Sequence, residues 1–188
     1  MFKAGKDRLV RRARRLLPVR LVRRFARQER GSTAIEFSLI ALPFLALMFA
    51  ILQTALVFFL GQTLESATTD SARLIMTGQA QLAGYDETKF KEEVCKRVSA
   101  LFDCDGKIYI NVKKYTSFSS VSTASPIKDG KLDTSAMGYD PGDPGDIVVV
   151  SLYYEWPIVV SLLGNDLADL GGNRLLVATS VFRNEPYK

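Results

Sequence analysis

The stretch that decides the fold is residues 31–60, GSTAIEFSLIALPFLALMFAILQTALVFFL. The 24 residues from Phe37 to Leu60 contain no charged side chain, and the six residues before them contain a single carboxylate, Glu36. About 20 apolar residues are enough for a helix to cross the hydrocarbon core of a bilayer. The sequence therefore predicts one transmembrane helix, and the remaining segments are best understood by the side of it on which they lie.

This segment divides the charge of the chain. Residues 1–31 carry 12 Lys and Arg against two acidic residues, whereas residues 32–188 carry 13 basic and 18 acidic residues. The net charge of +5 thus combines a leader of +10 with a remainder of −5. Because basic flanks stay on the cytoplasmic side of a membrane, we expect a cytoplasmic leader over residues 1–31, a transmembrane helix over residues 32–60 and an external domain over residues 61–188.

Apolar and arginine positions follow a helical spacing on both sides of Pro18 in the leader, which predicts two short amphipathic helices broken by the proline. Such helices bind the anionic inner leaflet. The alternative is a solvated segment that only sets the membrane topology. No nucleic-acid-binding fold accompanies these basic residues, so we expect no nucleic-acid partner.

The helix is expected to continue past the membrane, from near Thr33 to Thr77, with Gly78 as its stop. Beyond Leu60, an apolar stripe recurs at helical spacing and the charged residues lie off it. The stripe comprises Leu64, Ala67, Ser71, Leu74 and Ile75, and the charged residues are Glu65, Asp70 and Arg73. A second helix is expected to start at Asp86, with apolar positions at Phe90, Val94, Val98, Leu101 and Phe102.

Three strands are expected after these helices: Lys107–Tyr115, Ile147–Trp156 and Leu175–Phe182. A polar loop over residues 117–146 separates the first two, and residues 162–173 form a loop or short helix. The strongest strand, Ile147–Trp156, alternates between two faces and ends at Pro157. The predicted fold class is α+β, with a long N-terminal transmembrane helix that continues into a domain containing a second helix and a small antiparallel sheet over the helix's outer half.

Cys95 and Cys104 lie outside the cytoplasm in this topology, where thiols can pair. On one unbroken helix they would be about 13.5 Å apart along the axis, whereas a disulfide needs Cα atoms within about 7 Å. Either the helix ends near Phe102 and Cys104 turns back, or the bond does not form; we expect a structural disulfide. The chain has no histidine, so we expect no metal site, no cofactor and no catalytic cysteine.

Residues 140–146, DPGDPGD, contain three carboxylates. Asp-Pro-Gly repeats favour turns, and a calcium site is the alternative interpretation. Three aromatic side chains on the strongest strand, Tyr153, Tyr154 and Trp156, are expected to belong to the core and the sheet surface rather than to a ligand platform.

The pattern Gly31-Ser32-Thr33-Ala34-Ile35-Glu36-Phe37 resembles the type IV prepilin cleavage signal: a basic leader that ends in Gly, a cut after it, and Glu at the fifth mature position. The resemblance maps the cut between Gly31 and Ser32. A carboxylate in a membrane helix is costly without a partner, and the new α-amino group of Ser32 in a neighbouring subunit would supply one for Glu36.

Over about residues 28–80 the chain resembles the TadE-like proteins, pseudopilins of the Tad (Flp, tight-adherence) pilus. The resemblance rests on the leader, Glu36-Phe37, the apolar helix, Ser71-Ala72-Arg73 and Thr77-Gly78; the two cysteines and residues 182–186, FRNEP, are similar more loosely. It implies a minor pilin of the bacterial inner membrane with its C-terminal domain in the periplasm. Its implied partners are a prepilin peptidase, other Tad pilus subunits, the inner-membrane assembly platform and membrane lipid.

Two features depart from the family pattern. The 31-residue leader is long for the simplest type IV leaders, and Phe37 occupies the position where the main Flp pilin would favour Tyr. The competing interpretation is an uncleaved, single-pass anchored periplasmic scaffold or sensor. An ordinary signal peptide has a shorter apolar core and an A-x-A-like site. We expect no enzyme, because no nucleophile–base pair can be assembled from these residues.

Overall fold

The computed structural model describes residues 29–104, 106–122, 125–158 and 168–187, with side chains from Thr33 onward. The chain divides into two compact units, Met1–Phe49 and Ala50–Lys188, and each is treated by itself. The amphipathic helices expected before residue 29, and residues 162–167 of the expected loop or short helix, lie outside the described residues.

The first described element is helix α2, Glu29–Met76, which has 48 residues and includes Pro43. The described residues begin at Glu29, already within α2, and the helix ends one residue before the predicted end at Thr77. Gly78 has the positive φ angle, 77°, that terminates a helix, as predicted.

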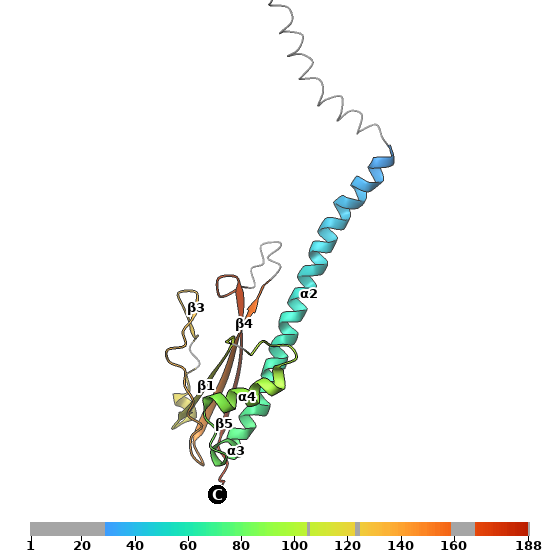
Figure 1. Ribbon diagram of the computed structural model, residues 1–188. Helices are drawn as coiled ribbons and strands as arrows, with labels where there is room; N and C mark the ends of the chain where they lie inside the picture. Colours follow the sequence, from blue (N-terminus) through green and yellow to red (C-terminus); the bar gives the residue numbers. More distant parts are fainter. Residues whose placement is uncertain (1–28, 105, 123–124, 159–167, 188) are drawn as a thin grey trace, which may run out of the picture. The chain divides into compact units, whose positions relative to one another are not determined.

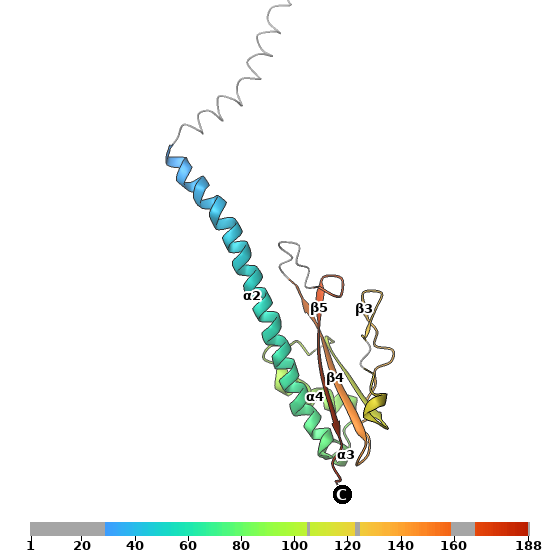
Figure 2. The same ribbon diagram turned by 180° about the vertical axis from the view of Figure 1, so that it is seen from behind.

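The second unit is built around a three-stranded antiparallel sheet, so the predicted α+β fold class is confirmed. Its strands are β1 (Ile108–Tyr115), β4 (Ile147–Pro157) and β5 (Asn173–Arg183), in the order β1-β4-β5. The last turns of α2 and helix α4 (Glu87–Val98) pack against one face and bury a single apolar core with it (Figures 1 and 2). The starts and ends of all three strands lie within two residues of the predicted ones.

The other face of the sheet is also covered. Ser151 and Tyr153 of β4 are buried there, and Tyr153 joins a small cluster that includes side chains from the hairpin β2 (Ile127–Lys128) and β3 (Lys131–Leu132). This hairpin and the short 3₁₀ helix η1 (Phe118–Ser120) fall in the segment predicted to be a polar loop. The hairpin turn is Asp129-Gly130, with φ angles of 50° and 69°, and Asp-Gly is a strong hairpin signal that the prediction missed.

Helix α4 starts as predicted and ends earlier than predicted. The Asp86 carboxylate caps it by accepting a hydrogen bond from the Lys89 N–H at 2.8 Å. Phe90, Val94 and Val98 are buried, as expected from their spacing. The prediction for Leu101 is wrong, because α4 ends at Val98 and the helical spacing no longer applies; Leu101 is 42% exposed, whereas Phe102 is buried.

The C-terminal residues 184–187 fold back onto the end of α2, beside the four-residue helix α3 (Gln79–Leu82) (Figure 1). The Glu185 N–H donates to the Met76 carbonyl at 2.9 Å. The buried Asn184 amide donates to the carbonyls of Pro141 and Asp143 at 2.9 and 3.1 Å. We call residues 184–187 the C-terminal clasp. The clasp bonds to both the end of α2 and the 140–146 loop. It therefore closes the end of the sheet at which β4 begins and β5 ends.

The clasp depends on a glycine at position 78. A Cβ placed there would lie 2.2 Å from the Tyr187 ring, and the positive φ angle disfavours any L side chain. Gly61, in the interior of α2, is the opposite case, because a Cβ there would meet nothing within 4 Å. The two glycines therefore form a matched pair.

We predict that Gly78→Ala lowers the free energy of unfolding by at least about 1–2 kcal/mol, the cost of a left-handed L residue. Gly61→Ala should raise it by about 0.5–1 kcal/mol, because alanine is the better helix former. Denaturant unfolding of the full chain in detergent micelles, followed by near-ultraviolet circular dichroism, measures both. Equal effects of the two substitutions would contradict this account of the clasp.

Candidate functional site

All four residues of the predicted processing signal lie within the first nine residues of α2. Gly31 and Ser32 lie close to the first described residue, Glu29, and Glu36 and Phe37 follow about one turn later. Ser32 and Glu36 are four residues apart, so the two positions share one face of the helix. The Phe37 ring is 72% exposed, and the Glu36 side chain is also exposed.

The helix surface that follows is apolar and is not covered by the described part of the chain. No side chain from Thr33 to Phe59 is buried. Fourteen of the nineteen large apolar side chains that the described residues expose lie between Ile35 and Phe59. By length and composition, α2 is a helix that could cross a membrane, with a mean hydropathy of 2.3 and none of its apolar window buried.

Polar side chains within this apolar stretch bond to the helix itself. The Ser38 hydroxyl donates to the Ala34 carbonyl at 2.7 Å, and the Thr54 hydroxyl donates to the Ala50 carbonyl at 2.9 Å. Such bonds satisfy hydroxyl groups where water is absent. The stretch is thus compatible with a hydrocarbon environment at these positions.

The character of α2 changes at Leu60, its first buried side chain. From there a stripe of apolar and small residues packs into the core: Leu60, Leu64, Ala67, Thr68, Ser71, Ala72 and Ile75. The predicted stripe is confirmed at four positions, and Leu74 is partly buried against the same core. Glu65, Asp70 and Arg73 are exposed, as expected.

Residues 31–73 match the family model described as TadE-like protein. Over these residues, less than a quarter of the chain, helix α2 is similar to TadE-like proteins. The match begins at Gly31 and ends at Arg73, so it includes Glu36, Phe37 and the buried stripe as far as Ala72. No curated protein and no solved structure matches the chain. TadE-like proteins are components of the Tad pilus system rather than enzymes, and the match supports a protein associated with that pilus.

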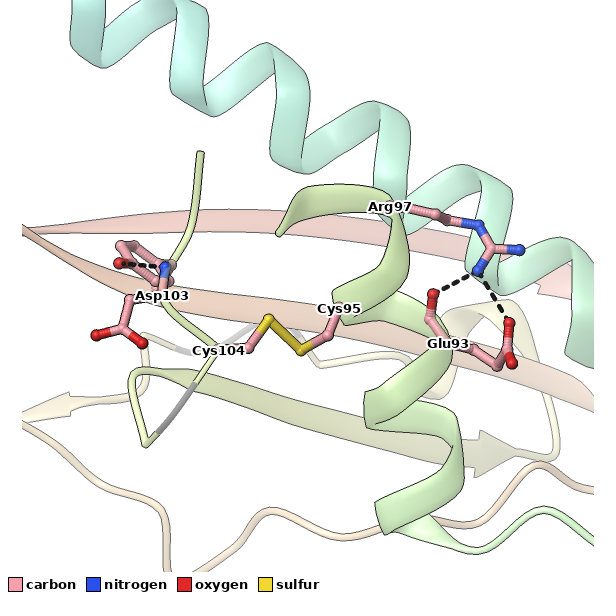
Figure 3. Close-up of a disulfide and its surroundings, with 6 residues drawn as sticks. Glu93, Cys95, Arg97, Asp103 and Cys104 are labelled. Carbon is pink, nitrogen blue, oxygen red and sulfur yellow. Dashed lines mark hydrogen bonds and ion pairs between the residues drawn. A yellow bond between two sulfur atoms is a disulfide. The ribbon is translucent and has the colours of Figure 1, made fainter. Parts of the chain in front are cut away.

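The two cysteines form a disulfide between α4 and the turn before β1 (Figure 3). Their Cα atoms are 6.0 Å apart. Of the two alternatives that the spacing left open, the structure adopts the one in which the chain turns back, although the helix ends at Val98 rather than near Phe102. The turn is held to the sheet because the Asp103 N–H donates to the Tyr154 hydroxyl at 3.2 Å.

Ion pairs surround this disulfide on the surface. Asp103 pairs with Lys107 at 3.0 Å, and this hydrogen bond raises the pKa of Lys107. Glu93 pairs with Lys96 at 2.6 Å and with Arg97 at 3.6 Å, and the hydrogen bond from Lys96 lowers the pKa of Glu93. Exposed pairs of this kind contribute little to stability, so the disulfide is the stronger constraint on the turn.

The DPGDPGD loop is a turn, as predicted. Asp140 accepts a hydrogen bond from the Gly142 N–H at 3.1 Å, and Asp146 accepts one from the Asp143 N–H at 2.9 Å. Gly142 and Gly145 have positive φ angles of 67° and 89°. The carboxylates of Asp140 and Asp146 thus bind the loop's own amides. In the described ranges, no group of three His, Cys, Asp or Glu side chains could hold a metal ion.

Aromatic residues of β4 belong to the core and the sheet surface, as expected. Tyr154 packs edge-on against Phe102, with ring centroids 4.8 Å apart, and Trp156 lies 6.3 Å from Tyr154. Tyr153 faces the opposite side. Another aromatic side chain, Tyr139, packs on Phe90 at 5.4 Å, and burial raises its pKa to about 12.

A hollow of about 330 Å³ lies on the outer face of the sheet, lined by residues that include Lys113, Lys128, Asp133, Ser151 and Thr179. Two pairs of polar side chains in this lining contact each other. Asp133 forms an ion pair with Lys128, and hydrogen bonding from Lys128 holds the pKa of this carboxyl well below its usual range. The hydroxyls of Ser151 and Thr179 lie 3.1 Å apart.

Sequence reasoning missed the meeting of two motifs that it had treated separately. The FRNEP segment and the DPGDPGD loop bind each other through Asn184, and Gln81 of α3 donates to the Pro141 carbonyl at 3.0 Å. The only local sign of this contact was Gly78, which was predicted only as the stop of the helix. Its contact with Tyr187 joins residues far apart in the chain, and no local pattern encodes such a contact.

We predict that the double substitution Cys95→Ala/Cys104→Ala lowers the free energy of unfolding by about 2–3 kcal/mol, because the bond closes a short loop in the unfolded chain. Denaturant unfolding of the full chain with and without reductant measures the difference. Reductant should destabilise the wild type by the same amount and leave the double variant unchanged. Equal stability of all four samples would show that the bond does not form.

Proposed function

We propose that this chain is a TadE-like minor pilin, or pseudopilin, that a prepilin peptidase cleaves between Gly31 and Ser32 and that acts in Tad/Flp pilus assembly and adhesion. The observation that carries the proposal is the position of the family match. It begins at Gly31, where the basic leader ends, and continues along an apolar helix that the described chain leaves uncovered.

The proposed location is the bacterial inner membrane. Residues 32–60 cross it once, the leader remains in the cytoplasm, and residues 61–188 form a periplasmic domain. The charge division supports this orientation, and so does the disulfide, which suits an oxidising compartment. The first buried side chain after Thr33, Leu60, coincides with the last residue of the apolar run from Phe37. A pilus subunit waiting for assembly would occupy such a position.

Cleavage requires the bond between Gly31 and Ser32 to adopt an extended backbone. In the structure this bond lies within α2. Glycine weakens a helix, so Gly31 makes this part of α2 easier to open. Opening one turn would present the bond at the cytoplasmic membrane face, where an integral-membrane peptidase can reach it.

Glu36 is proposed to guide docking after cleavage. Removal of the leader creates a positively charged α-amino group on Ser32, and a carboxylate near hydrocarbon interacts strongly with such a charge. An amino group of this kind on a neighbouring subunit would attract Glu36 and set the axial position of one helix against another. The proposed neighbours are other Tad pilus subunits, brought together at the inner-membrane assembly platform.

The first test is the N-terminal residue of the chain purified from membranes of cells that express the Tad system. We predict a mature chain that starts at Ser32, and a full-length precursor from the Gly31→Leu variant, because a bulky side chain would block the peptidase. Gly61→Ala serves as a glycine control and should be processed normally. A wild-type chain that retains Met1 would instead support the uncleaved periplasmic scaffold or sensor.

The second test concerns Glu36. We predict that Glu36→Ala is cleaved normally but that its amount in sheared pili, relative to membranes, falls by about tenfold or more, as expected when about 1.4 kcal/mol of docking energy is lost. Glu65→Ala is the matched control, because Glu65 is an exposed carboxylate on the same helix. Normal incorporation of the Glu36 variant would refute the docking role.

A further inference from the structure

The sheet has one edge that is protected and one that is open. On β1, the Val112 N–H donates to the Gly138 carbonyl at 2.7 Å, and the Val112 carbonyl accepts from the Asp140 N–H at 2.9 Å. The outer edge of β5 has no such cover within the described ranges. Soluble domains usually block an exposed edge strand, since its free backbone groups recruit other strands.

Hydrogen bonds at both ends of β5 show which of its backbone N–H and C=O groups face away from β4. The Asn184 N–H donates to the Asp146 carbonyl at 2.8 Å, and the Gly172 carbonyl accepts from the Ile158 N–H at 3.2 Å. Even-numbered residues of β5 therefore face β4, and the alternation of an antiparallel ladder turns the odd-numbered ones outward. The N–H and C=O groups of Leu175, Val177, Thr179 and Val181 have no hydrogen-bond partner among the described residues.

We call residues 175–181, LLVATSV, the β5 edge strip. It carries no charge, no proline and no glycine, so it lacks the features that usually prevent edge pairing. Val177 and Val181 are 51% and 41% exposed. Arginines flank the strip. Arg174 pairs with Asp169 at 2.7 Å, whereas Arg183 at the other end forms no ion pair with any described residue.

A groove of about 500 Å³ runs beside the start of the strip. Val57, Phe58 and Gly61 of α2 form one wall, residues 125–127 form another, and residues 174–177 line it from β5. A Cβ on Gly61 would meet nothing within 4 Å. An added strand could therefore direct alternate apolar side chains towards this wall of α2 and extend the existing sheet–helix packing.

A second copy of this chain does not fit the strip in a membrane. Helix α2 and β5 run in the same direction, because Gly61 lies beside the start of β5 and the Met76 carbonyl bonds to Glu185 at its end. Two β5 strips paired antiparallel about a twofold axis would place the two α2 helices antiparallel, whereas copies inserted alike keep them parallel. Pairing of β5 with a second copy's β1 is blocked by the Val112 bonds to Gly138 and Asp140.

We propose that the β5 edge strip accepts an extended strand from a different subunit anchored in the same membrane, which adds a fourth strand to the sheet. The strand is uncharged over about seven residues, carries apolar side chains at alternate positions, and has an acidic residue beside Arg183. Charge complementarity at Arg183 and the free backbone groups define this partner. The exclusion of a second copy rests on the membrane orientation proposed above.

The test places a photo-crosslinking amino acid at Val177, Thr179 or Val181 of the full chain in intact cells with the complete Tad system. The crosslinked partner peptides are then mapped by mass spectrometry. We expect all three positions to reach one segment of one partner, with the adduct moving by two residues for each two-residue step along β5. Leu82, which is 66% exposed on α3, is the control and should give no such series. Adducts to a second copy of this chain, or adducts scattered over many segments, would overturn the proposal.

A proline substitution in β5 provides a second, independent test of strand addition. Val177→Pro removes an N–H group that bonds to nothing in the described chain, so the fold should persist while crosslinking from Val181 falls at least tenfold. Ala178→Pro removes an N–H that faces β4, so it should lower the melting temperature. Undiminished crosslinking in folded Val177→Pro would contradict strand addition. The two proposals can fail separately. If the chain keeps Met1 but gives the regular series of crosslinks, only the proposed cleavage after Gly31 is refuted. If the chain starts at Ser32 but gives no such series, only the proposed strand site on β5 is refuted.

Discussion

The structure depends on one helix that the chain can bury only in part. Between Ile35 and Phe59, α2 exposes fourteen large apolar side chains. Burial of such a side chain contributes about 1.5–3 kcal/mol, so exposure of all fourteen to water would cost on the order of 20 kcal/mol. This exceeds the usual stability of a domain, about 5–15 kcal/mol. The surface therefore requires a cover from outside the described chain. In the proposed function this cover is first lipid and then, in the pilus, neighbouring helices.

The part of α2 from Leu60 onward differs, because the sheet and α4 bury one stripe of its side chains. Leu60 marks the change, and Gly78 ends the helix where the C-terminal clasp binds it. The disulfide adds a third constraint by joining α4 to the turn before β1. Residues from Ala50 onward thus form one compact unit, in which the last turns of the helix and the sheet are parts of the same core. In the proposed pilus subunit, the apolar segment would change its surroundings while this compact unit stays folded.

Features with a regular period could be predicted from the sequence, whereas features made by single long-range contacts could not. The stripe at Leu64, Ala67, Ser71 and Ile75, the alternation of β4, and the Asp86 cap all follow from local patterns. The β2–β3 hairpin was missed because two-residue strands have no period, and Leu101 was misplaced because the end of α4 at Val98 has no strong local stop signal. The clasp and the open β5 edge arise from tertiary pairing, which one sequence does not encode locally. At the candidate site, the residue types at Gly31, Ser32 and Glu36 indicated a role, but the helical state of the Gly31–Ser32 bond came only from the structure.

The most direct test of this account is the accessibility of α2 in the living membrane. Single cysteines at Ser38, Phe49, Gln62 and Glu65 can be probed with a membrane-impermeant maleimide in spheroplasts and in inverted inner-membrane vesicles, since the native cysteines are paired and do not react. The account predicts that positions 62 and 65 react in spheroplasts only, and that positions 38 and 49 react in neither preparation until detergent is added. Rapid labelling of positions 38 and 49 in intact membranes, or labelling of position 62 only in inverted vesicles, would contradict it.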